Sequence, residues 1–193
     1  NLGCPTPITP LTNDKATIDS AIDAMRAWSR GGTMSDIGMA WGLRVLSPEP
    51  PFAEGLAWNT PKWDKAVILM TDGDNQFFKL SSDTSPNRVN TAVNSDYSGY
   101  GRLDELGRMG TTSTTTAKSI INSRMSSVCQ AMKDKGIIVY TVTFTSNLNS
   151  TTRDLYRTCA TSPSKYFDSP TQDELRASFR AIATELSQLR LSL

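Results

Sequence analysis

The stretch Trp63–Asp74, W-D-K-A-V-I-L-M-T-D-G-D, decides the fold of this chain. Its apolar run Ala66–Met70 is partly β-branched and stops at a turn signal, which predicts a strand buried on both faces. Such strands belong to parallel sheets that helices cover on both sides. Ligands of open α/β sheets bind just beyond the carboxyl ends of the strands, where Asp72 and Asp74 stand. Two carboxylates there suit a hard cation or a phosphate, although Asp-Gly is also a common tight-turn dipeptide.

The composition of the 193 residues narrows the classes of function. The net charge is +1, with 20 Lys and Arg against 19 Asp and Glu, so nucleic acid is not expected as a partner. The sequence has no histidine, which excludes histidine triads, histidine general bases and histidine zinc sites. Its three cysteines form no C-x-x-C pair, so a thiolate metal site is not expected. No apolar run reaches the length of a membrane span.

Sequence periodicity predicts the order helix, helix, strand, long loop, helix, strand, helix, short strand, helix. The expected helices are residues 14–28, 34–46, 117–135, 150–159 and a last one after 169, and the expected strands are 66–70, 137–144 and 165–167. Strands that alternate with helices predict right-handed crossovers and a mostly parallel sheet. We expect the first helix to bury Ile18, Ala21 or Ile22, Met25 and Trp28, of which Trp28 lies outside the residues that the structure describes. The second helix should bury Ile37, Trp41 and Val45, and residues 4–13 should form the frayed end of an edge strand.

Two loops stand out as candidates for binding. Gly31-Gly32-Thr33 separates the first two helices and lets the backbone approach a ligand, although a helix cap explains the same residues. The segment 75–116 is long and polar, and loops of this length are usually functional or disordered. Its side chains best suited to contact a partner are Tyr97, Tyr100 and Arg102, and a solvated insertion is the alternative.

Several short motifs together resemble one family. They are I-T-P-L-T-N-D-K at 8–15, G-G-T at 31–33, W-G-L-R-V-L-S-P at 41–48, T-D-G-D-N at 71–75, Y-S-G-Y-G at 97–101, Y-T-V-T-F at 140–144 and Y-F-D-S-P at 166–170. With them the chain resembles a von Willebrand factor A domain, and most closely the C-terminal A-type domain of bacterial Tad (Flp) pilus assembly proteins of the TadE/TadG-like type. The resemblance implies a Rossmann-like, three-layer α-β-α fold with a mostly parallel sheet. Residues 1–193 would form one such domain, truncated at its N-terminus, with the insertion at about 75–116.

This resemblance implies a metal-ion-dependent adhesion site. The family pattern is D-x-S-x-S after the first strand, a threonine in a glycine-rich loop and an aspartate after the fourth strand, and here Thr33 and Asp72 match the last two. No D-x-S-x-S occurs in these residues, so we expect it upstream of Asn1. The cofactor would be Mg²⁺, or Mn²⁺ or Ca²⁺, or absent where the first motif is missing. Asp36 and Asp74 lie near the same rim and would be cap and turn residues, or alternatively would shape the site through outer-shell hydrogen bonds.

The resemblance also implies a function without an enzyme. The chain would be a protein-binding, adhesion module of a Tad/Flp pilus secretion apparatus, with a pilus or envelope component as its partner. It would act on the periplasmic or extracellular side of the cell envelope, anchored through an upstream membrane helix. One alternative is a scaffold of the same fold without metal. Another is a haloacid-dehalogenase-like phosphotransferase with Asp72 as nucleophile and Asp74 as general acid. Gln76 argues against it, because such enzymes usually have Thr or Val two places after the second aspartate.

Two structural expectations follow from the same resemblance. In an exported protein Cys129 and Cys159 can form a disulfide, with two buried free thiols as the alternative. The family's upstream strands would lie beside Ala66–Met70, so without them an apolar sheet edge is exposed. We expect self-association, or another chain, to cover that edge.

Overall fold

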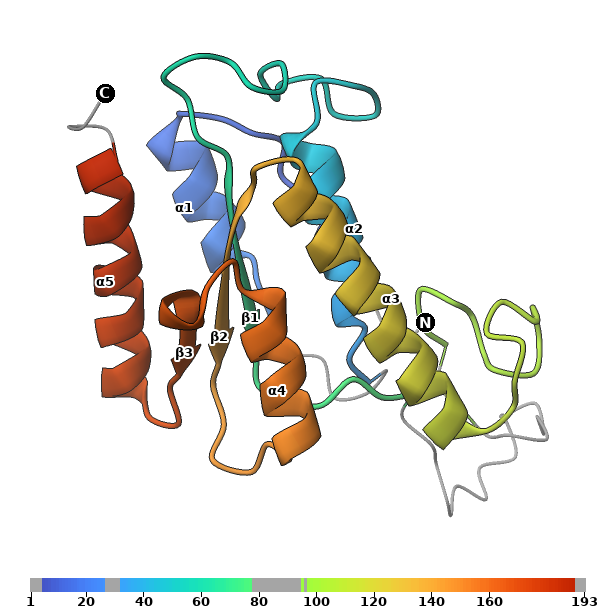
Figure 1. Ribbon diagram of the computed structural model, residues 1–193. Helices are drawn as coiled ribbons and strands as arrows, with labels where there is room; N and C mark the ends of the chain where they lie inside the picture. The colour runs from blue at the N-terminus through green and yellow to red at the C-terminus, as the bar shows by residue number, and fades with distance from the viewer. Residues whose placement is uncertain (1–4, 27–31, 78–94, 96, 190–193) are drawn as a thin grey trace.

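The computed structural model describes residues 5–26, 32–77, 95 and 97–189 (Figure 1). Its elements are α1 (Lys15–Asp23), α2 (Ser35–Leu46), β1 (Ala66–Thr71), α3 (Thr114–Asp134), β2 (Ile138–Thr143), α4 (Ser150–Cys159), the short 3-10 helix η1 (Pro163–Lys165), β3 (Tyr166–Asp168) and α5 (Gln172–Leu189). This order of helices and strands confirms the one predicted from periodicity.

The sheet of the described chain has three parallel strands in the order β1-β2-β3. β1 and β2 are in register from Ala66 opposite Ile138 to Thr71 opposite Thr143. β3 pairs with the second half of β2, starting at Tyr166 opposite Thr141. The chain is therefore mixed α/β with a small, open parallel sheet, and β1 lies at one edge of it.

Helices pack on both faces of this sheet (Figure 1). On one face α2, α3 and α4 form the main core with the strands, through Met39, Met125, Cys129, Met132, Ile137, Val139, Tyr156 and Cys159. On the other face Ile182 of α5 packs on Tyr140 and Val142 of β2. The two clusters use alternate residues of β2, because successive side chains of a strand point to opposite faces.

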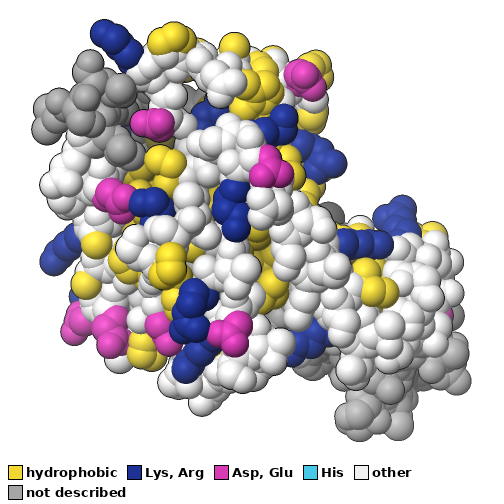
Figure 2. Space-filling view, in the orientation of Figure 1, with side chains coloured by type: hydrophobic (Ala, Val, Ile, Leu, Met, Phe, Trp, Pro, Cys, Tyr) yellow, Lys and Arg dark blue, Asp and Glu magenta, His cyan; other side chains and the backbone are white. Residues whose placement is uncertain are grey.

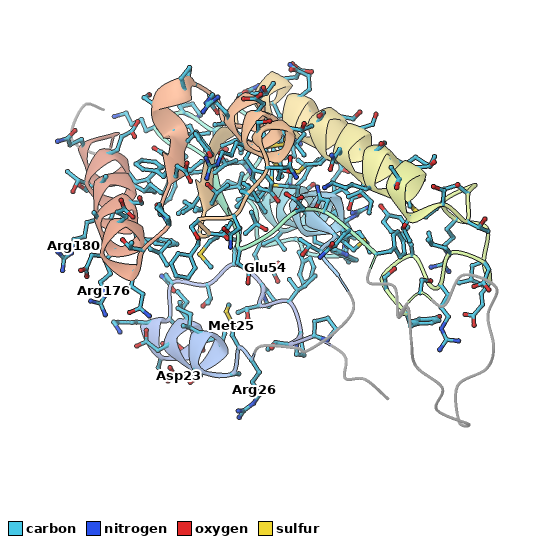
Figure 3. All side chains as sticks on the ribbon, turned by 90° about the horizontal axis from the view of Figure 1, so that it is seen from below. Asp23, Met25, Arg26, Glu54, Arg176 and Arg180 are labelled. Atoms are coloured by element: carbon cyan, nitrogen blue, oxygen red, sulfur yellow. A yellow bond between two sulfur atoms is a disulfide. The ribbon has the colours of Figure 1, made fainter. Side chains whose placement is uncertain are left out.

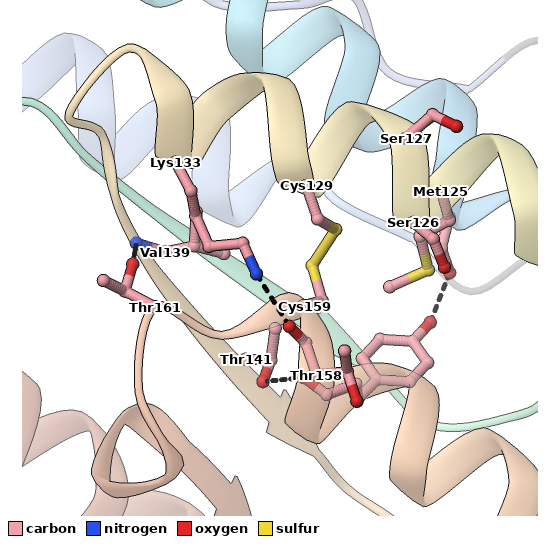
Figure 4. Close-up of a disulfide and its surroundings, with 12 residues drawn as sticks. Met125, Ser126, Ser127, Cys129, Lys133, Val139, Thr141, Thr158, Cys159 and Thr161 are labelled. Atoms are coloured by element: carbon pink, nitrogen blue, oxygen red, sulfur yellow. Dashed lines mark hydrogen bonds between the residues drawn. A yellow bond between two sulfur atoms is a disulfide. The ribbon is translucent and has the colours of Figure 1, made fainter.

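A disulfide between Cys129 and Cys159 joins α3 to the end of α4 within the main core (Figure 4). Lys133 of α3 reaches past it and donates to the backbone oxygen of Thr158 at 2.9 Å. The Thr141 hydroxyl of β2 donates to the backbone oxygen of Tyr156 at 2.8 Å. These bonds fix α4 against both α3 and the sheet.

The predicted buried face of the first helix is wrong. α1 ends at Asp23 and buries no residue, and Ile18 and Ile22 are 39% and 55% exposed. Figure 3 shows the reason, since α1 stands apart from the sheet and the other helices, with Met25 in the space between. Residues 5–13 form no strand either, which agrees with their three prolines lacking backbone donors.

The predicted buried face of the second helix is only partly right, since Ile37 and Val45 are half-buried but Trp41 is not. α2 places Met39 in the core together with Leu43 and Leu46, whereas Trp41 is 37% exposed. The helix carries two apolar stripes of similar spacing, and spacing alone cannot tell which one faces the sheet.

Candidate functional site

The glycine-rich loop lies directly against the segment that follows β1. The Thr33 N–H donates to the Gln76 carbonyl at 3.0 Å, and the Gln76 N–H donates back to the Thr33 carbonyl at 3.0 Å. Gly32 enters this pairing at φ +81°, a left-handed conformation that favours glycine. The loop that carries Thr33 therefore meets the segment 72–76, which begins with Asp72, at the carboxyl end of β1, and we call this region the rim. Thr33 is half-buried and the Asp72 side chain is exposed.

Asn75 is the buried centre of this rim. Its Oδ1 accepts the N–H of Ser35, at the start of α2, at 3.0 Å. Its Nδ2 donates to Oδ1 of Asn122 at 2.9 Å and to the sulfur of Met125 at 3.7 Å, both on α3. One fully buried amide thus fixes the loop, α2 and α3 relative to the end of β1. Sequence reasoning quoted Asn75 within T-D-G-D-N but assigned it no role.

Tyr156 of α4 contacts the start of α2 in the interior, beneath the rim. Its hydroxyl forms a hydrogen bond with the hydroxyl of Ser35, and the tyrosine is fully buried. Burial raises the pKa of Tyr156, and the carboxylates of Asp74 and Asp36 raise it further, although hydrogen bonds with Ser35 and Thr71 work in the opposite direction. The phenol is therefore a neutral, structural group that ties α4 to the start of α2.

The ammonium group of Lys118 holds the Asp74 side chain in place. Its Oδ2 accepts from Lys118 of α3 at 2.8 Å and from the side-chain amide of Asn149, which also caps α4. Burial opposes ionisation of Asp74, but the hydrogen bonds from Lys118 and Asn149 and the charge of Lys118 outweigh it and lower its pKa. Oδ1 is buried without a hydrogen-bond partner in the described structure. With an ammonium on one oxygen, Asp74 is better suited to position the loop than to bind a metal ion directly.

Asp36 is buried at the first turn of α2 and accepts a hydrogen bond from the Tyr100 hydroxyl. Burial and the neighbouring Asp36 raise the pKa of Tyr100, whose ring lies 4.8 Å from the guanidinium of Arg124. Tyr100 thus anchors the long loop to α2 and α3. Arg102 pairs with Glu105 within the loop at 3.1 Å. Of the three predicted contact residues, Tyr97 is the one with a mostly exposed side chain, at 63%.

The rim offers oxygen atoms, which are the ligands that a hard cation such as Mg²⁺ prefers. The Thr33 hydroxyl and the Asp72 carboxylate are ligands that Mg²⁺ accepts, and Mg²⁺ usually keeps several waters. Within the described ranges no three His, Cys, Asp or Glu side chains gather as a metal-binding group. Two protein ligands would leave most of the coordination sphere to water or to a partner.

Two hollows in the described structure are candidates for binding besides the rim itself. The larger, about 720 Å³, is at the opposite end of the sheet, where the Trp58 ring lies between the ammonium groups of Lys65 and Lys135 at 4.5 and 4.6 Å. The smaller, about 620 Å³, is lined by Asp36, next to the rim, and by Arg44 and Arg124. The smaller hollow is thus the one beside the candidate site.

Neither the charges on the molecular surface nor the comparisons with known proteins narrow the class of function further. Acidic and basic side chains are interspersed along the lower edge of the face in Figure 2, so that edge has no field of a single sign. In the ranges that the structure describes, no helix combines the length and the apolar character needed to cross a bilayer. Comparisons with protein-family models, curated proteins and solved structures returned no match.

Proposed function

We propose that this chain is a non-enzymatic, protein-binding module of the von Willebrand factor A type, which presents a divalent cation to a partner at the carboxyl end of β1. Its place would be a Tad/Flp pilus assembly apparatus on the outer side of the cell envelope, attached through an upstream membrane helix. The three-layer Rossmann-like fold belongs to the same proposal.

The observation that carries the proposal is the backbone pairing of Thr33 with Gln76. It brings the glycine-rich loop to the segment that contains Asp72, so a hydroxyl and an exposed carboxylate share one rim. Asn75 and the Ser35–Tyr156 pair hold that rim from beneath. A metal ion with two protein ligands retains exchangeable positions, and a carboxylate from a partner can take one of them.

The neighbouring hollow supports an acidic partner. Arg44 and Arg124 line it together with Trp41, Tyr100 and Asp36. The Arg124 guanidinium already donates to the backbone oxygen of Arg108, so Arg44 is the freer of the two arginines. Guanidinium groups bind carboxylates in a two-pronged geometry, and exposed aromatic rings are enriched in protein interfaces. A partner segment with one carboxylate on the cation and a second beside these arginines would use both features.

A scaffold of the same fold without metal is the second candidate. One observation favours it: Lys118 already neutralises Asp74, the other carboxylate of the T-D-G-D segment. In that case the partner would contact the rim and the long loop through protein groups alone.

Metal titration separates the two candidates. Mn²⁺ binding is measured for the wild type, Thr33→Ala and Asp72→Ala, with Asp64→Ala as a matched control because Asp64 is also exposed but precedes β1. The adhesion-site proposal predicts a saturable site that each rim variant weakens by at least about tenfold and that the control leaves unchanged. Equal affinity in all four proteins would favour the metal-free scaffold.

A further inference from the structure

The described part of the long insertion, residues 97–110, packs onto the fold through a small apolar core. Leu103 and Met109 are only 3% and 4% exposed, and they lie against Ala117 and Ile121 of α3. We call this cluster of buried residues the insertion core, and it lies beside the first turns of α3 (Figure 1). The insertion therefore has fixed neighbours, although its composition is polar.

The insertion core also contacts the residues that directly follow the rim pairing on both of its sides. Phe77 follows Gln76 and is a buried member of the core, at 4% exposure. Met34 follows Thr33 and packs against the same core. Thr33 and Gln76 exchange both of their backbone hydrogen bonds, each at 3.0 Å. The insertion thus covers the side chains next to the pairing that joins the glycine-rich loop to the segment after β1.

A tight turn of the insertion lies on the first turn of α2. The Tyr100 hydroxyl in this turn donates to the carboxylate of Asp36, a residue that is only 2% exposed. Gly99 approaches the helix so closely that a Cβ on it would lie 2.6 Å from the Cδ1 atom of Ile37. Asp36 stands three residues after Thr33, so the turn is attached to the start of the helix that the glycine-rich loop leads into.

We propose that the insertion is a clamp that holds the rim closed, with Tyr100 as its positioning residue. While the Tyr100 hydroxyl is bonded to Asp36, the turn and the insertion core stay on the start of α2, and Thr33 stays paired with Gln76. Loss of that bond lets the glycine-rich loop separate from the segment after β1. A hydrogen bond to a carboxylate is roughly twice as strong as one between neutral groups, and a buried carboxylate that loses its donor is unfavourable. The inference rests on the proposed function only in its consequence, which is that the clamp fixes Thr33 as a ligand for the cation.

Amide hydrogen exchange, followed by NMR on the metal-free protein, tests the clamp. The amides of Thr33 and Gln76 are the two donors of the rim pairing, so their exchange rates report how often the pairing opens. Tyr100→Phe removes the hydroxyl and keeps the ring, and both amides should then exchange about ten- to a hundredfold faster. Tyr97→Phe is the control within the insertion, since Tyr97 is 63% exposed, and it should leave both rates unchanged.

Repeating the measurement with Mg²⁺ distinguishes the clamp from the cation site. An ion bound to Thr33 should slow the exchange of its amide in the wild type, because the ion binds the closed rim and not the open one. If Mg²⁺ leaves that rate unchanged while Tyr100→Phe still raises it in the metal-free protein, the cation site is contradicted and the clamp is supported.

A second control separates opening of the rim from unfolding of the whole protein. Thr141→Val removes the buried hydrogen bond from Thr141 to the Tyr156 carbonyl, between β2 and α4. This variant should speed exchange in β2 and leave the Thr33 and Gln76 amides at their wild-type rates. Rates at these two amides that are unchanged in Tyr100→Phe, or that rise equally in Thr141→Val, would overturn the clamp.

Discussion

Removal of the Cys129–Cys159 disulfide should cost this protein a large share of its stability. The bridge spans a sequence separation of 30 residues and lies in the main core between α3 and α4. In the loop-entropy treatment, a cross-link over a loop of this length stabilises the folded state by about 3.6 kcal/mol at 25 °C. Cys129→Ala with Cys159→Ala removes the bridge and leaves no buried hydroxyl in its place. Small domains often have a total stability of only about 5–15 kcal/mol, so the loss should be easily measured.

Urea denaturation followed by circular dichroism provides the assay. The free energy of unfolding of the double variant should fall by about 3–4 kcal/mol, and a reducing agent should lower the wild type to nearly the same value. Cys4→Ser is the control and should change neither the wild-type curve nor its response to the reducing agent. A loss below about 1 kcal/mol, or a wild type that ignores the reducing agent, would refute the structural role of the bridge.

Three further predictions concern the rim. Asn75→Ala should destabilise the protein by about 2–3 kcal/mol in thermal or urea unfolding, because the Ser35 N–H loses its buried acceptor; a change within about 0.5 kcal/mol would contradict the network. Asp74 has a lowered pKa, so its stabilisation is present above about pH 4 and is lost as the pH falls through the folded-state value. Asp74→Asn should therefore be less stable than the wild type by about 1 kcal/mol at pH 7 and should close that gap below pH 4, whereas parallel curves would exclude the ion pair as the cause. Finally, the wild type should hydrolyse p-nitrophenyl phosphate with Mg²⁺ no faster than Asp72→Ala does, and Asp72-dependent turnover would instead support the phosphotransferase alternative.

The strands were the most predictable part of this fold. The runs Ala66–Met70 and Ile137–Phe144 are rich in apolar and β-branched residues over a whole strand length, so local sequence suffices to assign them. Burial of the helices depends on what lies opposite, and for the first two helices the prediction failed in whole or in part. α1 has a clear apolar stripe, yet no element of the described structure covers it, and α2 turns a different stripe to the sheet.

The rim was predictable only in outline. Pairing a glycine-rich loop with a T-D-G segment relied on the family resemblance, and the structure brings the two backbones together at Thr33 and Gln76. The contacts of Asn75 and Lys118 could not be predicted, because their partners lie 40 or more residues away in the sequence. Lys118 in particular lies in the first turns of a helix, a position that gives no sign of an aspartate nearby.

The most direct test of the central claim is to locate a bound ion by NMR. Substoichiometric Mn²⁺ broadens amide signals in its neighbourhood, so it reports which backbone segments surround the ion. We predict that the signals of Gly32–Met34 and Thr71–Asp74 broaden first, while Gly136 at the opposite end of the sheet stays sharp. Broadening confined to other segments, or equal broadening in the Asp72→Ala variant, would contradict a cation site formed by Thr33 and Asp72.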